Sequence, residues 1–272
     1  MNKAITIIIF STLFFGHIYA QHITHASCEV QYVTTCIKDT IKNEVLTDTF
    51  CLRYNSTKSL FFNKEVFMMD SLKRNDIETW RKKCSLDNIE SQKVKANLSY
   101  YVFLDQKEGT YMYEELIGTN KYRYTENIPS LEWKITNEKK YIGGHKCKKA
   151  TTTFRGRTYI AWFATDIKEQ FGPWKLCGLP GLILEAHDTK EQYCFKFLDI
   201  HPSDGIIEKP TGNAFKTTFE TFTIEKQKYL ENPIDYLANK SIIKISFGKN
   251  DTYFTNDIKN KCRHEPMEIM TK

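Results

Sequence analysis

The sequence predicts a mainly β protein, with one curved antiparallel sheet or half-barrel and one or two short helices packed on it. Apolar and polar residues alternate in most segments, which is the period of a half-buried strand. Turn residues recur about every ten positions, as in a meander of short strands. Phe, Trp and Tyr make up 14% of the chain, enough to fill a substantial core.

Residues 1–20 have the pattern of a secretory signal peptide, with a basic start, a short apolar run and Ala20 at the end. An N-terminal membrane anchor is the alternative, but the apolar run is shorter than the roughly 20 residues that span a bilayer. We expect an exported chain beginning near Gln21, in the periplasm or outer envelope, with no transmembrane segment. His25 stands where a lipoprotein signal before Cys28 would have an aliphatic residue, so we expect no lipid anchor.

The first strands are read from alternation, and one helix from a change of period. Val30, Tyr32 and Thr34 alternate, and so do Phe50 and Leu52. Short strands are expected at 30–34, 50–54 and 60–62. A capping box of Asn75 and Glu78, followed by Ile77, Trp80 and Cys84 at helical spacing, predicts a helix over 75–84.

From residue 99 the chain has the pattern of a meander broken by glycine-containing turns. Strands are expected at 101–104, 110–117, 122–125, 133–135, 147–154, 158–165, 182–186, 193–198, 215–222 and 242–247. The step Arg155-Gly156-Arg157 predicts a tight hairpin. Helices are expected over 224–230 and 234–237. We therefore assign 21–240 to a single β domain and 241–272 to a C-terminal extension, and expect a monomer.

Eight cysteines in an exported chain favour disulfides. Cys36 and Cys51 are a candidate pair, because a turn centred on 43–44 would place them directly opposite. Free buried thiols are the alternative, and a zinc site is a weaker one because no C-x2-4-C pair exists. We expect neither a metal site nor a cofactor.

The run from Gly178 to Leu184 combines glycine and proline, which have special backbone conformations, with large apolar residues. Proline fixes φ and glycine permits positive φ, so Pro180-Gly181 is expected at the centre of a type II turn. Leu182, Ile183 and Leu184 then enter a strand that is apolar on both faces. Gly172-Pro173-Trp174 precedes this corner. The unit is interpreted as a rigid buried corner of the sheet, with the motif residues Gly172, Pro173, Gly178, Gly181, Leu182, Ile183 and Leu184.

This segment resembles the GLPGLI family, exported proteins of Gram-negative bacteria, because residues 178–183 reproduce all six letters of that motif. Flanking runs at 142–144, 147–150, 154–157, 161–163 and 232–234 resemble the family too. Lys168 departs from the proline that family members often have there. The family has no established activity, so the resemblance implies export and a place in the cell envelope, not a reaction.

In a second interpretation, the same corner borders a ligand-binding cleft. Trp162 and Trp174, with Leu179 and Pro180, would rim an apolar cleft between the sheet and its helices. The leading functional hypothesis is therefore a non-enzymatic binding or accessory protein that takes a lipid or an apolar peptide. Its expected sheet resembles the half-barrel of periplasmic lipoprotein carriers. An interaction module that docks an outer-membrane transporter through Trp174 and Leu176 is the alternative.

Catalytic patterns give little support to an enzyme. The sequence has no G-x-S-x-G elbow, H-E-x-x-H helix or phosphate-binding glycine loop. His187-Asp188 falls in an expected turn, and Glu114, Glu115 and Glu185 are interpreted as charged strand positions that face solvent, since nothing in the sequence makes these carboxylates face one another. We assign no catalytic residue, and keep a hydrolase with an unrecognised site as a third hypothesis. Lysines are dispersed, so the net charge of +6 does not indicate nucleic-acid binding.

Overall fold

The structure is a computed structural model that describes residues 24–39, 44–84, 98–240 and 267–268. These residues form one sheet of twelve strands and four short helices, which confirms the predicted mainly β class. The predicted signal peptide at 1–20 and the predicted strand at 242–247 lie outside the described residues.

The strands follow the predicted meander closely, but most are longer than alternation alone indicates. They are β1 (Cys28–Asp39), β2 (Glu44–Tyr54), β3 (Lys58–Asn63), β4 (Tyr100–Asp105), β5 (Thr110–Ile117), β6 (Asn120–Asn127), β7 (Lys134–Ile142), β8 (His145–Phe154), β9 (Arg157–Ala164), β10 (Leu182–Asp188), β11 (Tyr193–Pro202) and β12 (Phe215–Lys216). The helices are α1 (Lys64–Asn75), α2 (Ile77–Cys84), α3 (Phe219–Glu231) and α4 (Pro233–Lys240).

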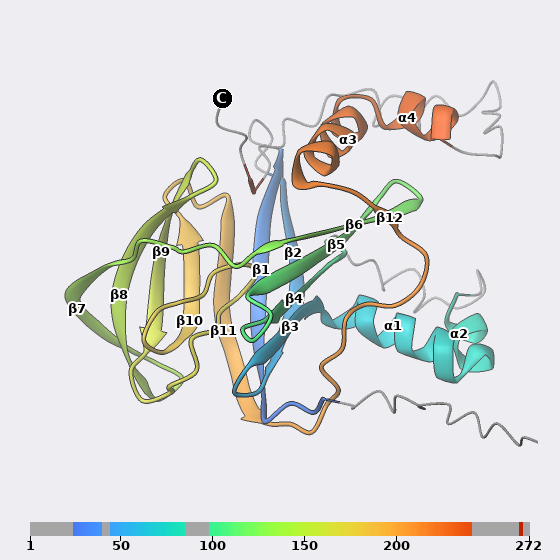
Figure 1. The fold of residues 1–272 in the computed structure, drawn as a ribbon. Coiled ribbons are helices and arrows are strands. Elements are labelled where there is room, and N and C mark those ends of the chain that lie inside the picture. Colours follow the sequence, from blue (N-terminus) through green and yellow to red (C-terminus); the bar gives the residue numbers. More distant parts are fainter. Residues whose placement is uncertain (1–23, 40–43, 85–97, 241–266, 269–272) are drawn as a thin grey trace, which may run out of the picture.

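The sheet is open and uncurled, with β12 at one edge and β7 at the other. Its order is β12-β6-β5-β4-β3-β2-β1-β11-β10-β9-β8-β7. Neighbouring strands are antiparallel except for the short β12, which runs parallel to β6. In Figure 1 the long strand β1 joins two wings, β2–β6 on one side and β7–β11 on the other.

Side-chain alternation gives the sheet two apolar faces. On β3, Phe61 belongs to the larger core, while Leu60 and Phe62 belong to a smaller one. Phe67 of α1 packs on Phe62 and covers the smaller core, with ring centroids 4.3 Å apart. Phe219 and Phe222 of α3 pack into the larger core instead. The two helices therefore cover opposite faces of the sheet.

Helix α1 is absent from the sequence prediction, and α2 begins two residues later than predicted. Asn63 caps α1, because its Oδ1 accepts from the backbone N of Glu65 at 3.0 Å and of Val66 at 3.2 Å. At α2 the capping side chain is Asp76, whose Oδ1 accepts from Thr79 N at 3.0 Å. The helix prediction over 75–84 thus holds, but its cap is Asp76 and not Asn75.

The predicted Cys36–Cys51 disulfide is wrong. In the β1–β2 register Cys36 lies opposite Leu46, and Cys51 lies opposite Gln31. Cys36 and Gln31 are five positions apart on one strand, an odd number, so the two thiols point to opposite faces of the sheet. The seven cysteines in the described part of the chain form no disulfide.

Candidate functional site

The segment between β9 and β10, residues 165–181, enters the larger core with its second half. Its side chains Phe171, Trp174, Leu176 and Leu179 are almost fully buried, with Trp174 3% exposed and both Leu176 and Leu179 0% exposed. Trp174 takes a φ of +55° and packs between Phe154 and Tyr159, at centroid distances of 5.7 and 5.8 Å. The second half of this connection is therefore part of the core, whereas residues 165–170 are exposed or half-buried.

The Gly-Leu-Pro-Gly corner is held by close backbone contacts. The backbone N of Gly181 donates to the carbonyl of Leu179 at 2.7 Å. This i to i+2 bond makes a γ-turn centred on Pro180, in place of the predicted type II turn. A Cβ at Gly181 would lie 2.0 Å from the carbonyl oxygen of Ala164 on β9. Leu182, Ile183 and Leu184 then enter β10 fully buried, as the sequence predicts.

Of the four predicted contact residues, the structure buries two and separates the others. Trp174 and Leu179 lie in the core, whereas Pro180 is exposed at the corner. Trp162 is half-buried on the outer face of β9, where Lys140 Nζ lies 4.5 Å from its ring centroid. Trp162 and Trp174 therefore do not rim one cleft.

The most unusual group in the core is the ammonium of Lys175, which follows Trp174 directly. Lys175 is 1% exposed, and a charge so deeply buried needs strong partners. Five aromatic rings lie within cation–π distance of its Nζ. Their centroids lie at 4.6 Å for Tyr113, 4.8 Å for Tyr111, 5.0 Å for Tyr124, 5.3 Å for Trp174 and 5.8 Å for Phe219.

Two oxygen atoms accept hydrogen bonds from this ammonium. Nζ of Lys175 donates to Tyr124 Oη at 2.6 Å and to Glu268 Oε1 at 2.6 Å. Tyr124 Oη donates in turn to Glu268 Oε2 at 3.2 Å. Burial lowers the pKa of Lys175 from 10.5 to about 8, although the charge of Glu268 opposes that shift. Burial also raises the pKa of Tyr124 well above 10, so its phenol keeps its proton.

A second ion pair borders this cage. The predicted hairpin at 155–157 is confirmed, since Arg155 and Gly156 have positive φ and Phe154 pairs with Arg157. The turn directs Arg155 onto Glu126, with N–O distances of 2.7 and 2.8 Å. Arg155 Nε also lies 3.7 Å from Glu268 Oε1. The site thus holds two cations, Lys175 and Arg155, against two carboxylates.

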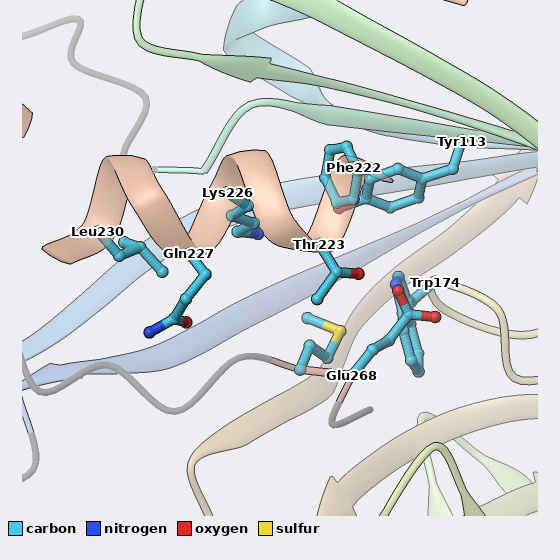
Figure 2. Close-up of a pocket in the computed structure, with 9 residues that line it drawn as sticks. Tyr113, Trp174, Phe222, Thr223, Lys226, Gln227, Leu230 and Glu268 are labelled. Carbon is cyan, nitrogen blue, oxygen red and sulfur yellow. The ribbon is translucent and has the colours of Figure 1, made fainter. Parts of the chain in front are cut away.

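A cleft opens beside the cage, between α3 and Trp174. Figure 2 shows Phe222, Thr223, Lys226, Gln227 and Leu230 along α3, with Trp174 and Glu268 facing them. Tyr113 and Met267 complete the lining. The hollow measures about 30 Å³, room for one or two water molecules. Of the four residues predicted to rim a cleft, Trp174 lines this hollow, and Trp162, Leu179 and Pro180 do not.

A second hollow of about 20 Å³ lies beneath α1. Most of its charged lining is already paired. Glu114 is buried and pairs with Arg123, and its Oε1 lies 3.7 Å from Lys121 Nζ. Lys121 in turn lies 3.4 Å from Asp70 on α1. These pairs hold α1 on the sheet, so the first cleft is the better candidate for a ligand.

The residues of the hydrolase hypothesis do not form a catalytic cluster. His187 lies opposite Cys194 in the β10–β11 register, but its Nδ1 is 3.0 Å from the carbonyl of Asp188. The Cys194 thiol lies 3.6 Å from the carbonyl of Glu191, and burial raises its pKa. Glu185 pairs with Lys140. A thiol that holds its proton is a poor nucleophile.

The sequence-based hypotheses missed Lys175, Tyr124 and Glu268. The sequence contained one signal for Lys175, because it is the only charged residue between Phe171 and Leu184 in an otherwise apolar run. No comparable signal marks Glu268, which lies in a polar tail 93 positions further along.

The described residues contain no group of three or more His, Cys, Asp and Glu side chains that could hold a metal ion. Within the same ranges, no helix is long and apolar enough to cross a membrane.

Comparisons with known proteins give a weak structural likeness. No family model matches the chain, and a search of curated proteins finds no match. Two solved structures of a protein named PNGF-II, in the P21 and C2 space groups, have TM-scores of 0.49 and 0.48 and sequence identities of 16% and 17%. The matches cover 73% and 75% of this chain but 32% and 33% of PNGF-II, so this chain spans about a third of that protein's length.

Proposed function

We propose that this chain is an exported, non-enzymatic binding or accessory protein of the cell envelope, of the GLPGLI type, and that it works as a monomer. Its binding site is the cleft between α3 and Trp174, and its ligand carries an apolar group, as in a lipid or an apolar peptide. The observation that carries this proposal is the aromatic cage around Lys175, which lies directly beside that cleft.

The physical support is the mixture of groups at this place. Trp174, Phe222 and Leu230 supply apolar surface, and Thr223, Lys226, Gln227 and Glu268 supply polar groups. Ligand sites commonly combine apolar walls with few well-placed polar groups. The hollow is small as it stands, so a ligand larger than a few atoms must displace Met267, which is only partly buried.

The docking alternative has less support. Its predicted surface was Trp174 with Leu176, and both side chains lie in the core. The hydrolase alternative needs an activated nucleophile, and Cys194 opposite His187 is not one.

Titration of the mature protein with the apolar dye N-phenylnaphthylamine tests the proposal. We expect saturable fluorescence enhancement that Leu230→Glu weakens at least about tenfold, because it places a charge in the cleft. Ile224→Glu is the matched control, since Ile224 lies on the same helix but is 46% exposed and does not line the cleft. Absence of saturable binding, or equal loss in both variants, would contradict the proposed function.

A further inference from the structure

The contacts of Met267 and Glu268 resemble those of a bound ligand. The Glu268 carboxylate accepts from Lys175 and Tyr124 and lies close to Arg155. The backbone oxygen of Met267 accepts from Tyr159 Oη at 3.2 Å. Both residues also line the hollow beside α3.

Among the described residues, the groups that hold this pair by hydrogen bonds come from the β domain. Lys175, Tyr124 and Tyr159 precede their partners by 93, 144 and 108 positions. Met267 supplies an apolar side chain and Glu268 a carboxylate, and the two residues are adjacent in the sequence. The site thus recognises a small chemical unit, a carboxylate next to an apolar group.

The charge balance of the site also favours a carboxylate at the position of Glu268. With Glu268 in place, Lys175 and Arg155 face two carboxylates, Glu126 and Glu268. If Glu268 left, two cations would face one carboxylate, so the site would carry one net positive charge among aromatic rings. An unpaired buried charge is strongly unfavourable, so the vacated site would favour another anion.

We infer that the cleft is a site for an apolar carboxylate, and that Met267 and Glu268 occupy it as a tethered substitute for that ligand. The inference rests on the proposed function and names its ligand class. A fatty acid and a peptide with an apolar residue beside a carboxylate both carry this chemistry. An external ligand competes with an occupant on the same chain, so the occupant lowers the apparent affinity for that ligand.

The competition is tested on the full mature chain with four proteins. They are the wild type, Glu268→Gln, Lys175→Met and the double variant. The glutamine keeps the shape of the side chain and removes its charge, so the cage keeps its packing. The probes are dodecanoate and dodecanol, which share one apolar chain and differ in the carboxylate. Displacement of N-phenylnaphthylamine and calorimetry measure their affinities.

We expect Glu268→Gln to bind dodecanoate at least about tenfold more tightly than the wild type does, because the tethered carboxylate no longer competes. Dodecanol should gain much less, and the preference for dodecanoate should vanish in Lys175→Met and in the double variant. A peptide arm, acetyl-Pro-Met-Glu-amide, distinguishes the sources, since tighter binding than dodecanoate identifies a peptide ligand and weaker binding a fatty acid.

Three negative results have different meanings. If all four proteins bind both probes without preferring the acid, the carboxylate inference is overturned while the apolar cleft stands. If no protein binds dodecanol, dodecanoate or the dye, the proposed function fails as well. If Glu268→Gln leaves the affinity for dodecanoate unchanged although the wild type binds it, Glu268 is a structural counter-ion and not a substitute for a ligand.

Discussion

Lys175 Nζ lies 2.6 Å from a carboxylate oxygen of Glu268, although 93 positions separate the two residues. The pair joins the connection that carries the Gly-Leu-Pro-Gly corner to the C-terminal part of the chain. At least residues 267–268 of the predicted C-terminal extension therefore belong to the core of the β domain. The predictions below follow from this pair and from the corner that positions it.

The stability of the protein should rise with pH in a range set by Lys175. Below about pH 8 this lysine is charged in both the folded and the unfolded chain, and burial penalises the folded state. Between about pH 8 and 10.5 the unfolded chain still binds the proton that the folded chain releases, so folding becomes more favourable. The expected gain between pH 7 and pH 10 is about 2 kcal/mol.

Urea unfolding at several pH values measures this gain against Lys175→Met/Glu268→Gln, in which both charges are absent. The difference between the two proteins isolates the Lys175–Glu268 pair, because the other ionisable groups around the ammonium are present in both. Those groups are Tyr111, Tyr113, Tyr124, Glu126 and Arg155. A difference that stays constant over this range would show that the ammonium is not buried as described.

The two glycines of the Gly-Leu-Pro-Gly corner should respond differently to alanine. Both have positive φ, +85° at Gly178 and +155° at Gly181. At Gly181 a Cβ would also collide with the carbonyl of Ala164, whereas at Gly178 no atom lies within 4 Å. We expect Gly178→Ala to lower the unfolding free energy by about 1–2 kcal/mol, and Gly181→Ala by roughly 4 kcal/mol or more. Thermal and urea unfolding of both variants give the comparison, and equal losses would contradict the described corner.

The buried thiols should be unreactive in the folded protein. Burial raises the pKa of Cys36 to about 11 and those of Cys51 and Cys177 to about 12. At pH 8 the thiolate fraction of each is therefore of order one in a thousand or less. Iodoacetamide followed by mass spectrometry should modify the exposed Cys84 first, and these three only after unfolding. A peptide linked through Cys36 and Cys51 would refute the register of β1 and β2.

The sequence predicts most strands because each has its own local signal, the alternation of apolar side chains. Prediction from the sequence fails where a strand pattern and a helix pattern overlap. Residues 215–222 are predicted as one strand, but β12 ends at Lys216 and α3 begins at Phe219. Thr218 caps this helix through its Oγ1, which accepts from Thr221 N at 3.3 Å. Phe219 and Phe222 are buried at helical spacing, so a capping residue and a three-residue period outweigh the strand pattern.

The candidate site could be predicted only in part. Trp174 and the apolar corner are local features, and Trp174 lines the cleft. Lys175 could have been noticed as the only charge in an apolar run. Its pairing with Glu268 depends on how distant segments meet in the core, and a single sequence contains no local signal of such a contact. The disulfide prediction failed for the same reason, because it required the register of two strands.

A double-mutant cycle on Lys175 and Glu268 tests the central claim most directly. The unfolding free energies of the wild type, Lys175→Met, Glu268→Gln and the double variant are measured at pH 7. Because each single variant leaves a buried group without its partner, we predict a coupling energy of about 2 kcal/mol or more. A coupling within about 0.5 kcal/mol of zero would contradict the account, since Glu268 would then not occupy the site beside Lys175.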